Sequence, residues 1–163
     1  LSLKLARGDA RAALDRSKQD LERFASSPLR SSNAVAGQIQ TAAAASALAL
    51  AAASQGRERA ELLRFVDKLL GKRLDPFVLL QSAALTNLQG GRDQAVEALR
   101  AALRDRRIAA TPTFAQAASR QLGRMLGGDE GQSLVRQADA FFRPGGVVEP
   151  ERFVSSILPG FGT

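Results

Sequence analysis

Residues 75–103 read DPFVLLQSAALTNLQGGRDQAVEALRAAL, and this stretch decides the fold class. Asp75-Pro76 is a helix start, because Asp accepts hydrogen bonds from free N–H groups and Pro fits the first helical turn. A run without charge follows from Pro76 to Leu88, and Gly90-Gly91 then interrupts it. The charged segment from Arg92 to Ala109 places its apolar residues at helical spacing. The stretch therefore predicts two consecutive helices joined by a glycine turn.

The same order of helix, glycine turn and helix recurs along the chain. Turns near Gly8, Gly56, Gly90 and Gly128 lie at spacings of about 48, 34 and 37 residues. A period in the mid-thirties is typical of helical-hairpin repeats, which bury their apolar faces only by stacking. No segment alternates in polarity as a strand does. We expect helices over 10–26, 31–54, 57–70, 76–88, 92–109, 112–126, 129–143 and 149–158, after the end of an earlier helix at 1–6.

Charge also alternates between helices. The helices expected over 31–54 and 76–88 hold no charged residue, whereas their partners over 57–70 and 92–107 are rich in charge. A helix without charge must be covered on most sides, but an amphipathic helix needs only one buried stripe. Stacked hairpins produce this alternation, and a four-helix bundle does not. The pattern favours an α-solenoid of helical hairpins in one domain over residues 1–163. Within it, we expect Asp129 to be the N-cap of the helix over 129–143.

The last helix carries an apolar stripe that suits a terminal cap. Phe153, Val154, Ile157 and Leu158 share one face of residues 149–158, and Pro159-Gly160 ends the helix. The last hairpin of a solenoid leaves one apolar face uncovered, and repeat proteins need a terminal element there. We therefore expect a C-terminal capping helix. The alternative is a detachable peptide that docks on another domain.

Composition excludes several classes of site. The 163 residues include no His and no Cys, which removes imidazole bases, thiol nucleophiles, disulfides and Cys/His zinc sites. We expect no catalytic residue, no cofactor and no metal, and a cytoplasmic location. The apolar run from Ala42 to Ala53 is too short and too poor in large side chains for a membrane span. Because the chain begins with Leu1 and a helical pattern, we expect a C-terminal fragment of a larger protein.

The net charge of +7 raises the possibility of a nucleic-acid partner. Positive and negative residues are interleaved in both halves of the chain. The densest basic cluster is Arg100, Arg104, Arg106 and Arg107, with Asp105 inside it. We expect Arg100, Arg104 and Arg107 to be solvated. A basic helical module that binds nucleic acid is kept as the alternative function.

Three glycine turns are followed by a shared pattern of small and aliphatic residues. Gly8 precedes Ala13-Leu14, Gly90 precedes Ala95-Val96, and Gly128 precedes Ser133-Leu134, each by five residues. This pattern resembles the second half of tetratricopeptide repeats. Small residues there allow a close helix crossing, and we expect Ala95, Leu99, Ala102 and Leu103 to be buried. The bulky aromatic residue and the Gly of the family's first helix are missing.

The resemblance to tetratricopeptide repeats implies a concave groove lined by the first helix of each hairpin. On the best repeat it places Phe77, Leu80, Ala84, Asn87 and Leu88 on the groove side. Asn87 would then hold a peptide backbone, unless it caps its own helix. Arg120 and Arg124 would pair with an acidic partner, unless they are simply solvated. Phe77, Asn87, Arg120 and Arg124 are the candidate partner-binding residues.

Residues 127–163 resemble a second family through a Gly-Val step, Pro-Glu-Arg and then Leu-Pro-Gly-Phe. This segment is similar to the C-terminal tail of large bacterial serine/threonine kinases of the myxobacterial type and related signalling ATPases. The resemblance implies a regulatory or scaffold module of a signalling protein that is not itself catalytic, because no kinase motif is present. Its partner would be a protein or another domain of the same polypeptide.

Residues 127–130 read GGDE, which matches part of the diguanylate cyclase signature. That enzyme needs the motif on a β-hairpin, but helical patterns flank it here on both sides. The expected Phe is replaced by Gly131, and no upstream strand carries a metal-binding Asp. We therefore interpret residues 127–130 as a turn between two helices.

Overall fold

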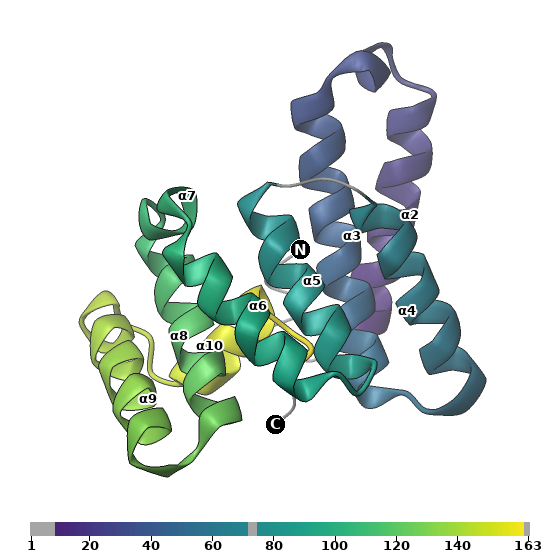
Figure 1. Cartoon of the computed structure of the whole chain (residues 1–163). Helices are drawn as coiled ribbons and strands as arrows, with labels where there is room; N and C mark the ends of the chain where they lie inside the picture. Colours follow the sequence, from purple (N-terminus) through teal and green to yellow (C-terminus); the bar gives the residue numbers. More distant parts are fainter. Residues whose placement is uncertain (1–8, 72–74, 162–163) are drawn as a thin grey trace.

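The computed structural model describes residues 9–71 and 75–161, and every regular element in them is helical (Figure 1). The elements are α2 (Ala10–Ala25), η1 (Pro28–Ser31), α3 (Asn33–Ala53), α4 (Gly56–Leu70), α5 (Pro76–Leu88), α6 (Arg92–Arg104), α7 (Arg106–Ala109), α8 (Pro112–Leu126), α9 (Gly128–Phe142), η2 (Arg143–Gly145) and α10 (Pro150–Ile157). The all-α prediction is confirmed for this part of the chain. The helix end expected at 1–6 and the turn at Gly8 lie outside the described residues.

Glycine-containing turns join successive helices at the expected places. Gly56 begins α4, Gly90-Gly91 separates α5 from α6, and Gly127-Gly128 separates α8 from α9. Gly90 has a φ of +92° and Gly127 a φ of +67°, which side-chain-bearing residues rarely adopt. The predicted turns near Gly56, Gly90 and Gly128 are confirmed, and no β-hairpin forms at the GGDE sequence.

Helices that are neighbours in sequence pack side by side. The most extensive contacts join α2 with α3, α3 with α4, α5 with α6, and α8 with α9. Between these pairs, α5 packs against both α3 and α4, and α6 packs against α8. In Figure 1 the pairs follow one another across the molecule, from the purple and blue helices to the green ones. Successive helix pairs therefore pack on one another along the chain.

Two arginines link successive helix pairs through the same kind of contact. Arg59 of α4 donates to the Leu88 carbonyl at the end of α5, with an N···O distance of 2.6 Å. Arg92 of α6 donates to the Met125 carbonyl near the end of α8, at 2.5 Å. The last carbonyls of a helix lack partners within the helix, and a cation there also complements the helix dipole. The recurrence shows that the α4–α5 and α6–α8 junctions are built alike.

The helices without charge supply many of the core residues. Ala44, Ala47 and Leu48 of α3 and Ala83 and Ala84 of α5 are fully buried. With 21 residues, α3 is long and apolar enough to cross a membrane by length and composition, the only such helix in the described residues. Its central face instead packs against α2, α4 and α5. The alanines allow these neighbours to approach closely.

The predicted burial pattern on α6 holds for its inward face. Ala95, Leu99 and Ala102 are buried, and Arg104 of the same helix is exposed. Leu103 is only partly buried, and Arg100 is half-buried rather than fully exposed. The apolar stripe is therefore narrower than the sequence pattern indicates.

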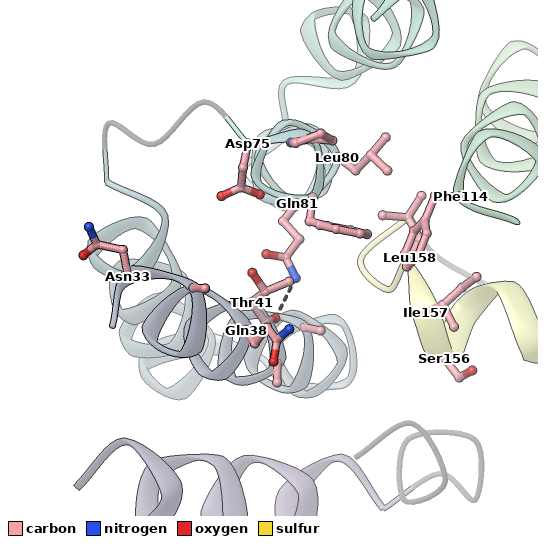
Figure 2. Close-up of a pocket in the computed structure, with 16 residues that line it drawn as sticks. Asn33, Gln38, Thr41, Asp75, Leu80, Gln81, Phe114, Ser156, Ile157 and Leu158 are labelled. Atoms are coloured by element: carbon pink, nitrogen blue, oxygen red, sulfur yellow. Dashed lines mark hydrogen bonds between the residues drawn. The ribbon is translucent and has the colours of Figure 1, made fainter. Parts of the chain in front are cut away.

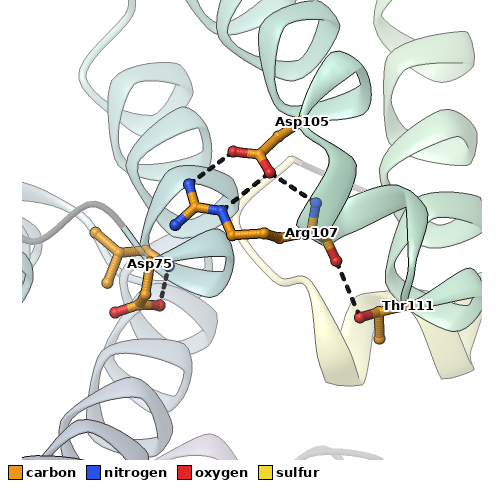
Figure 3. Close-up of polar contacts among 5 residues, drawn as sticks. Asp75, Asp105, Arg107 and Thr111 are labelled. Carbon is orange, nitrogen blue, oxygen red and sulfur yellow. Dashed lines mark hydrogen bonds and ion pairs between the residues drawn. The ribbon is translucent and has the colours of Figure 1, made fainter.

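The segment from Arg92 to Ala109 is two helices rather than the one predicted. Asp105 has extended backbone geometry (φ −72°, ψ +123°) and acts as the N-cap of α7. Its carboxylate accepts hydrogen bonds from the backbone N–H and the guanidinium of Arg107 (Figure 3). An Asp side chain that bonds nearby backbone competes with helix continuation, so the chain breaks there.

The start of α9 also differs from the prediction. Gly127 is the N-cap, and Asp129 lies inside the first turn without capping it. Both Gly127 and Gly128 have positive φ, so the reversal is completed by the glycines before Asp129 is reached. Gly123 and Gly131 then bring α8 and α9 into backbone contact. A Cβ added at either glycine would overlap the other's carbonyl oxygen.

Helix α10 turns back toward the first helices of the chain. It contacts α8 and α3, and the ring of Phe153 packs against Phe142 with centroids 5.3 Å apart. Figure 1 shows α10 in yellow behind α6, between α8 and α3. Val154 and Leu158 are buried as expected, whereas Phe141 remains 42% exposed. The apolar stripe of α10 therefore packs on α3 as well as on α8. We expected a terminal cap, which would cover the last helix pair alone.

Candidate functional site

A pocket of about 560 Å³ lies where α3, α5, α8 and α10 face one another. Its walls come from the N-terminal half of α3, the start of α5, Phe114 of α8 and residues 156–158 (Figure 2). Most lining groups are apolar, and the polar ones include Gln38, Thr41 and Gln81. Apolar walls with few polar groups are typical of sites that bind a small molecule or a partner's side chain.

Phe77 forms part of the pocket wall at the start of α5. Its ring meets that of Phe114 edge-on, with centroids 4.6 Å apart and an interplanar angle of 79°. The Phe77 side chain is 37% exposed, which is unusual among the large apolar residues of this protein. Pro76 and the N-cap Asp75 fix the helix start and hence the position of this ring. Of the predicted binding residues, Phe77 is the one that lines this pocket.

Gln81 lies one helical turn beyond Phe77 and crosses from α5 to α3. Its Nε2 donates to the Thr41 carbonyl at 2.8 Å, as Figure 2 shows. The residue is 4% exposed, and its Oε1 is buried without a hydrogen-bond partner in the described structure. Gln81 was not predicted from the sequence as a site residue. The available signal was a long polar side chain in the middle of a charge-free helix.

The segment that follows α10 runs across α5 and α8 and is held by its main chain. Asn87 of α5 donates from Nδ2 to the Gly160 carbonyl at 2.9 Å. Gln121 of α8 donates from Nε2 to the Leu158 carbonyl at 3.2 Å. Leu158 is 1% exposed and Phe161 is 8% exposed. Two side-chain amides from two helices thus bind the backbone of one non-helical segment. We call the surface formed by the pocket and these two amides the groove.

Two predicted binding residues make contacts within the protein. Arg120 is 6% exposed, and its Nε donates to Asp139 of α9 at 2.7 Å, so it stabilises the α8–α9 pair. Arg124 forms an ion pair with Glu151 of α10 at 3.1 Å. Arg120 was expected as a surface group and is buried instead. The structure therefore brings Phe77 and Asn87 to the groove, places Arg124 against α10 and separates Arg120 from the groove.

The basic cluster considered for nucleic acid is partly neutralised. Arg100 pairs with Glu97 at 2.7 Å, and Arg107 pairs with Asp105 at 2.7 Å (Figure 3). Hydrogen bonds from Arg107 lower the pKa of the Asp105 carboxyl to about 2. The Arg107 guanidinium thus faces a carboxylate that stays charged at neutral pH. Arg104 and Arg106 are exposed.

No group of three or more His, Cys, Asp or Glu side chains that could hold a metal occurs within residues 9–71 and 75–161. Comparisons with protein-family models, with curated proteins and with solved structures found no match for this chain. The contacts of the groove are therefore the basis for a functional assignment.

Proposed function

We propose that this chain is a non-catalytic interaction module whose groove binds an extended segment of a protein partner. In this proposal the helix pairs are tetratricopeptide-like hairpins of an α-solenoid, and α3, α5 and α8 are the first helices that form its concave side. The repeated arginine contacts at Leu88 and Met125 support this repeat arrangement. The binding segment belongs to another protein or to another domain of the same polypeptide.

The observation that carries the proposal is the way in which the groove binds residues 158–161. Asn87 and Gln121 donate to main-chain carbonyls, which every peptide offers whatever its side chains. Main-chain hydrogen bonds with pockets for selected side chains are a recurring mode of peptide recognition. The groove therefore has the chemistry to bind extended peptide backbone.

The pocket adjoins the segment that these amides hold, because Leu158 lines it, and it supplies the site for a side chain. Its volume of about 560 Å³ accommodates an aromatic or a large aliphatic group. Phe77 and Phe114 both line it, and aromatic rings pack favourably against such a group. An apolar residue next to a bound backbone segment is the partner feature that this surface fits.

The resemblance of residues 127–163 to bacterial signalling proteins extends the proposal to a setting. A regulatory or scaffold module of a cytoplasmic serine/threonine kinase or a related ATPase is consistent with a groove for protein segments. The nucleic-acid alternative has less support, because Arg100 and Arg107 are paired with carboxylates. A kinase or ATPase domain in the same polypeptide would be found by sequencing the full reading frame.

Selection of peptides from a displayed random library on the full chain tests the proposed function. We expect peptides rich in apolar residues, with affinities that fall at least tenfold on Phe77→Ala. Phe141→Ala is the matched control, because Phe141 is similarly exposed, at 42%, but lies on α9 outside the groove. Selected peptides that bind Phe77→Ala as tightly as the unchanged chain would contradict the proposed function.

A further inference from the structure

We propose that residues 158–161 are a built-in occupant of the groove, and that its external partner carries the same chemistry: an aliphatic residue, Pro, Gly and an aromatic residue in sequence. This inference rests on the proposed function and specifies the partner. It follows from how closely the groove fits Leu158-Pro159-Gly160-Phe161. All four residues are buried.

Gly160 is the residue that the groove selects most strictly. Its φ is +100°, and a Cβ added there would lie 3.0 Å from the Ala84 Cβ and 3.4 Å from the Leu88 Cδ1. Any other residue would be strained in this conformation and crowded against α5. The glycine also lets its own carbonyl reach Asn87. A partner segment needs Gly at the same place.

The neighbours of Gly160 complete the pattern. Pro159 has no N–H to satisfy, and the carbonyls of Leu158 and Gly160 on either side of it accept from Gln121 and Asn87. A residue before Pro avoids helical geometry, and Leu158, with φ −136° and ψ +73°, is no longer helical. Leu158 before the Pro159-Gly160 pair and Phe161 after it are both buried in the apolar core.

The exposed link before α10 allows α10 and residues 158–161 to leave the groove together. Residues 143–146 are exposed, Gly146 has a φ of +80°, and Val148 is 91% exposed. A short tether gives its own segment an effective concentration on the order of millimolar. A partner segment therefore competes with residues 158–161, and the occupied groove holds weak partners off.

A labelled peptide that corresponds to residues 149–161 tests the competition on the full chain. We expect Gly160→Val to increase the peptide's affinity at least tenfold over the unchanged chain, because the tethered competitor no longer fits. Gly145→Val is the matched control, since a Cβ at Gly145 meets nothing within 4 Å. Adding Asn87→Ala to Gly160→Val should reverse the gain. A folded Gly160→Val chain with no gain in affinity would overturn the proposal.

A second measurement on the unchanged chain decides the matter if Gly160→Val does not fold. Excess peptide should accelerate amide hydrogen exchange at Leu158, Gly160 and Phe161, while a peptide of scrambled sequence should not. Unchanged exchange at these amides overturns the inference. If exchange at these amides is unchanged but library peptides still bind in a Phe77-dependent way, residues 158–161 are not a built-in occupant, and the proposed function stands. If the peptide accelerates exchange but Phe77→Ala does not weaken the binding of library peptides, the role proposed for the pocket is wrong, and the built-in occupant stands.

Discussion

Single polar side chains define the groove at the scale of the residue. Asn87 and Gln121 are buried or half-buried amides on helices that are otherwise mostly apolar at these faces, and each finds a backbone carbonyl of residues 158–161. A buried amide without a partner costs about 1–3 kcal/mol. These residues therefore require a backbone segment next to them, whether it comes from this chain or from a partner.

Asp105→Asn tests the residue that divides α6 from α7. The hydrogen bonds from Arg107 lower the pKa of the Asp105 carboxyl from 3.8 to about 2, so ionised Asp105 stabilises the folded state. A lowered pKa gives stability that is present above pH 3.8 and is lost as the pH falls toward 2. We expect Asp105→Asn to melt at lower temperature than the unchanged chain at pH 7.

Thermal melts from pH 7 down to pH 3 measure this difference. It should shrink below about pH 4 and also with added salt, because the ion pair is exposed. Glu97→Gln is the matched control, since Glu97 forms an exposed pair with Arg100 but caps no helix. A difference in melting temperature that does not change with pH would show that the charge of Asp105 does not stabilise the break between α6 and α7.

Helix ends and helix pairs follow from local sequence at the scale of the element. The helix start at Asp75-Pro76 and the turns at Gly56 and Gly90 were predicted, because each of these signals acts within a few residues of itself. The α6–α7 break was missed, because Asp105 was read as one charge in a basic run, although its carboxylate accepts hydrogen bonds from the backbone and side chain of Arg107 two residues away. The Gly123–Gly131 crossing was missed for a different reason, since it needs two helices in contact.

Gly131→Ala tests that crossing. The added Cβ would overlap the Gly123 carbonyl, which belongs to the backbone and cannot rotate away. We expect the free energy of unfolding, measured by denaturant titration, to fall by about 1–3 kcal/mol. Gly145→Ala is the control, because that position is open, and it should leave stability unchanged. Equal stability of Gly131→Ala and the unchanged chain would contradict the close α8–α9 approach.

The chain's last segment closes the structure at the scale of the whole molecule. Val154, Leu158 and Phe161 are buried where α10 and the following residues meet α3, α5 and α8. This apolar stripe was predicted from the sequence but was expected at the end of the array, because an amphipathic pattern shows that a face is buried and not which helices cover it. Gln81 and Gln121 were missed as groove residues for the same reason: their partners, Thr41 and Leu158, are distant in sequence.

Ending the chain at Gly146 tests how much this segment stabilises the fold. Each buried aliphatic or aromatic side chain contributes about 1.5–3 kcal/mol, less the cost of ordering the segment. We expect the shortened chain to melt at lower temperature and to bind an apolar fluorescent dye along the uncovered surface. Val148→Ser is the control, because Val148 is 91% exposed. An unchanged melting temperature and no dye binding would contradict the placement of residues 150–161.

The central claim is that the groove binds extended peptide backbone through Asn87 and Gln121. Nuclear magnetic resonance of the side-chain amides of the full chain, titrated with a library-selected peptide, tests it most directly. The claim predicts that the Asn87 and Gln121 amide signals shift on binding, while that of Gln137, exposed on α9, does not. Binding that leaves the Asn87 and Gln121 signals in place would contradict it.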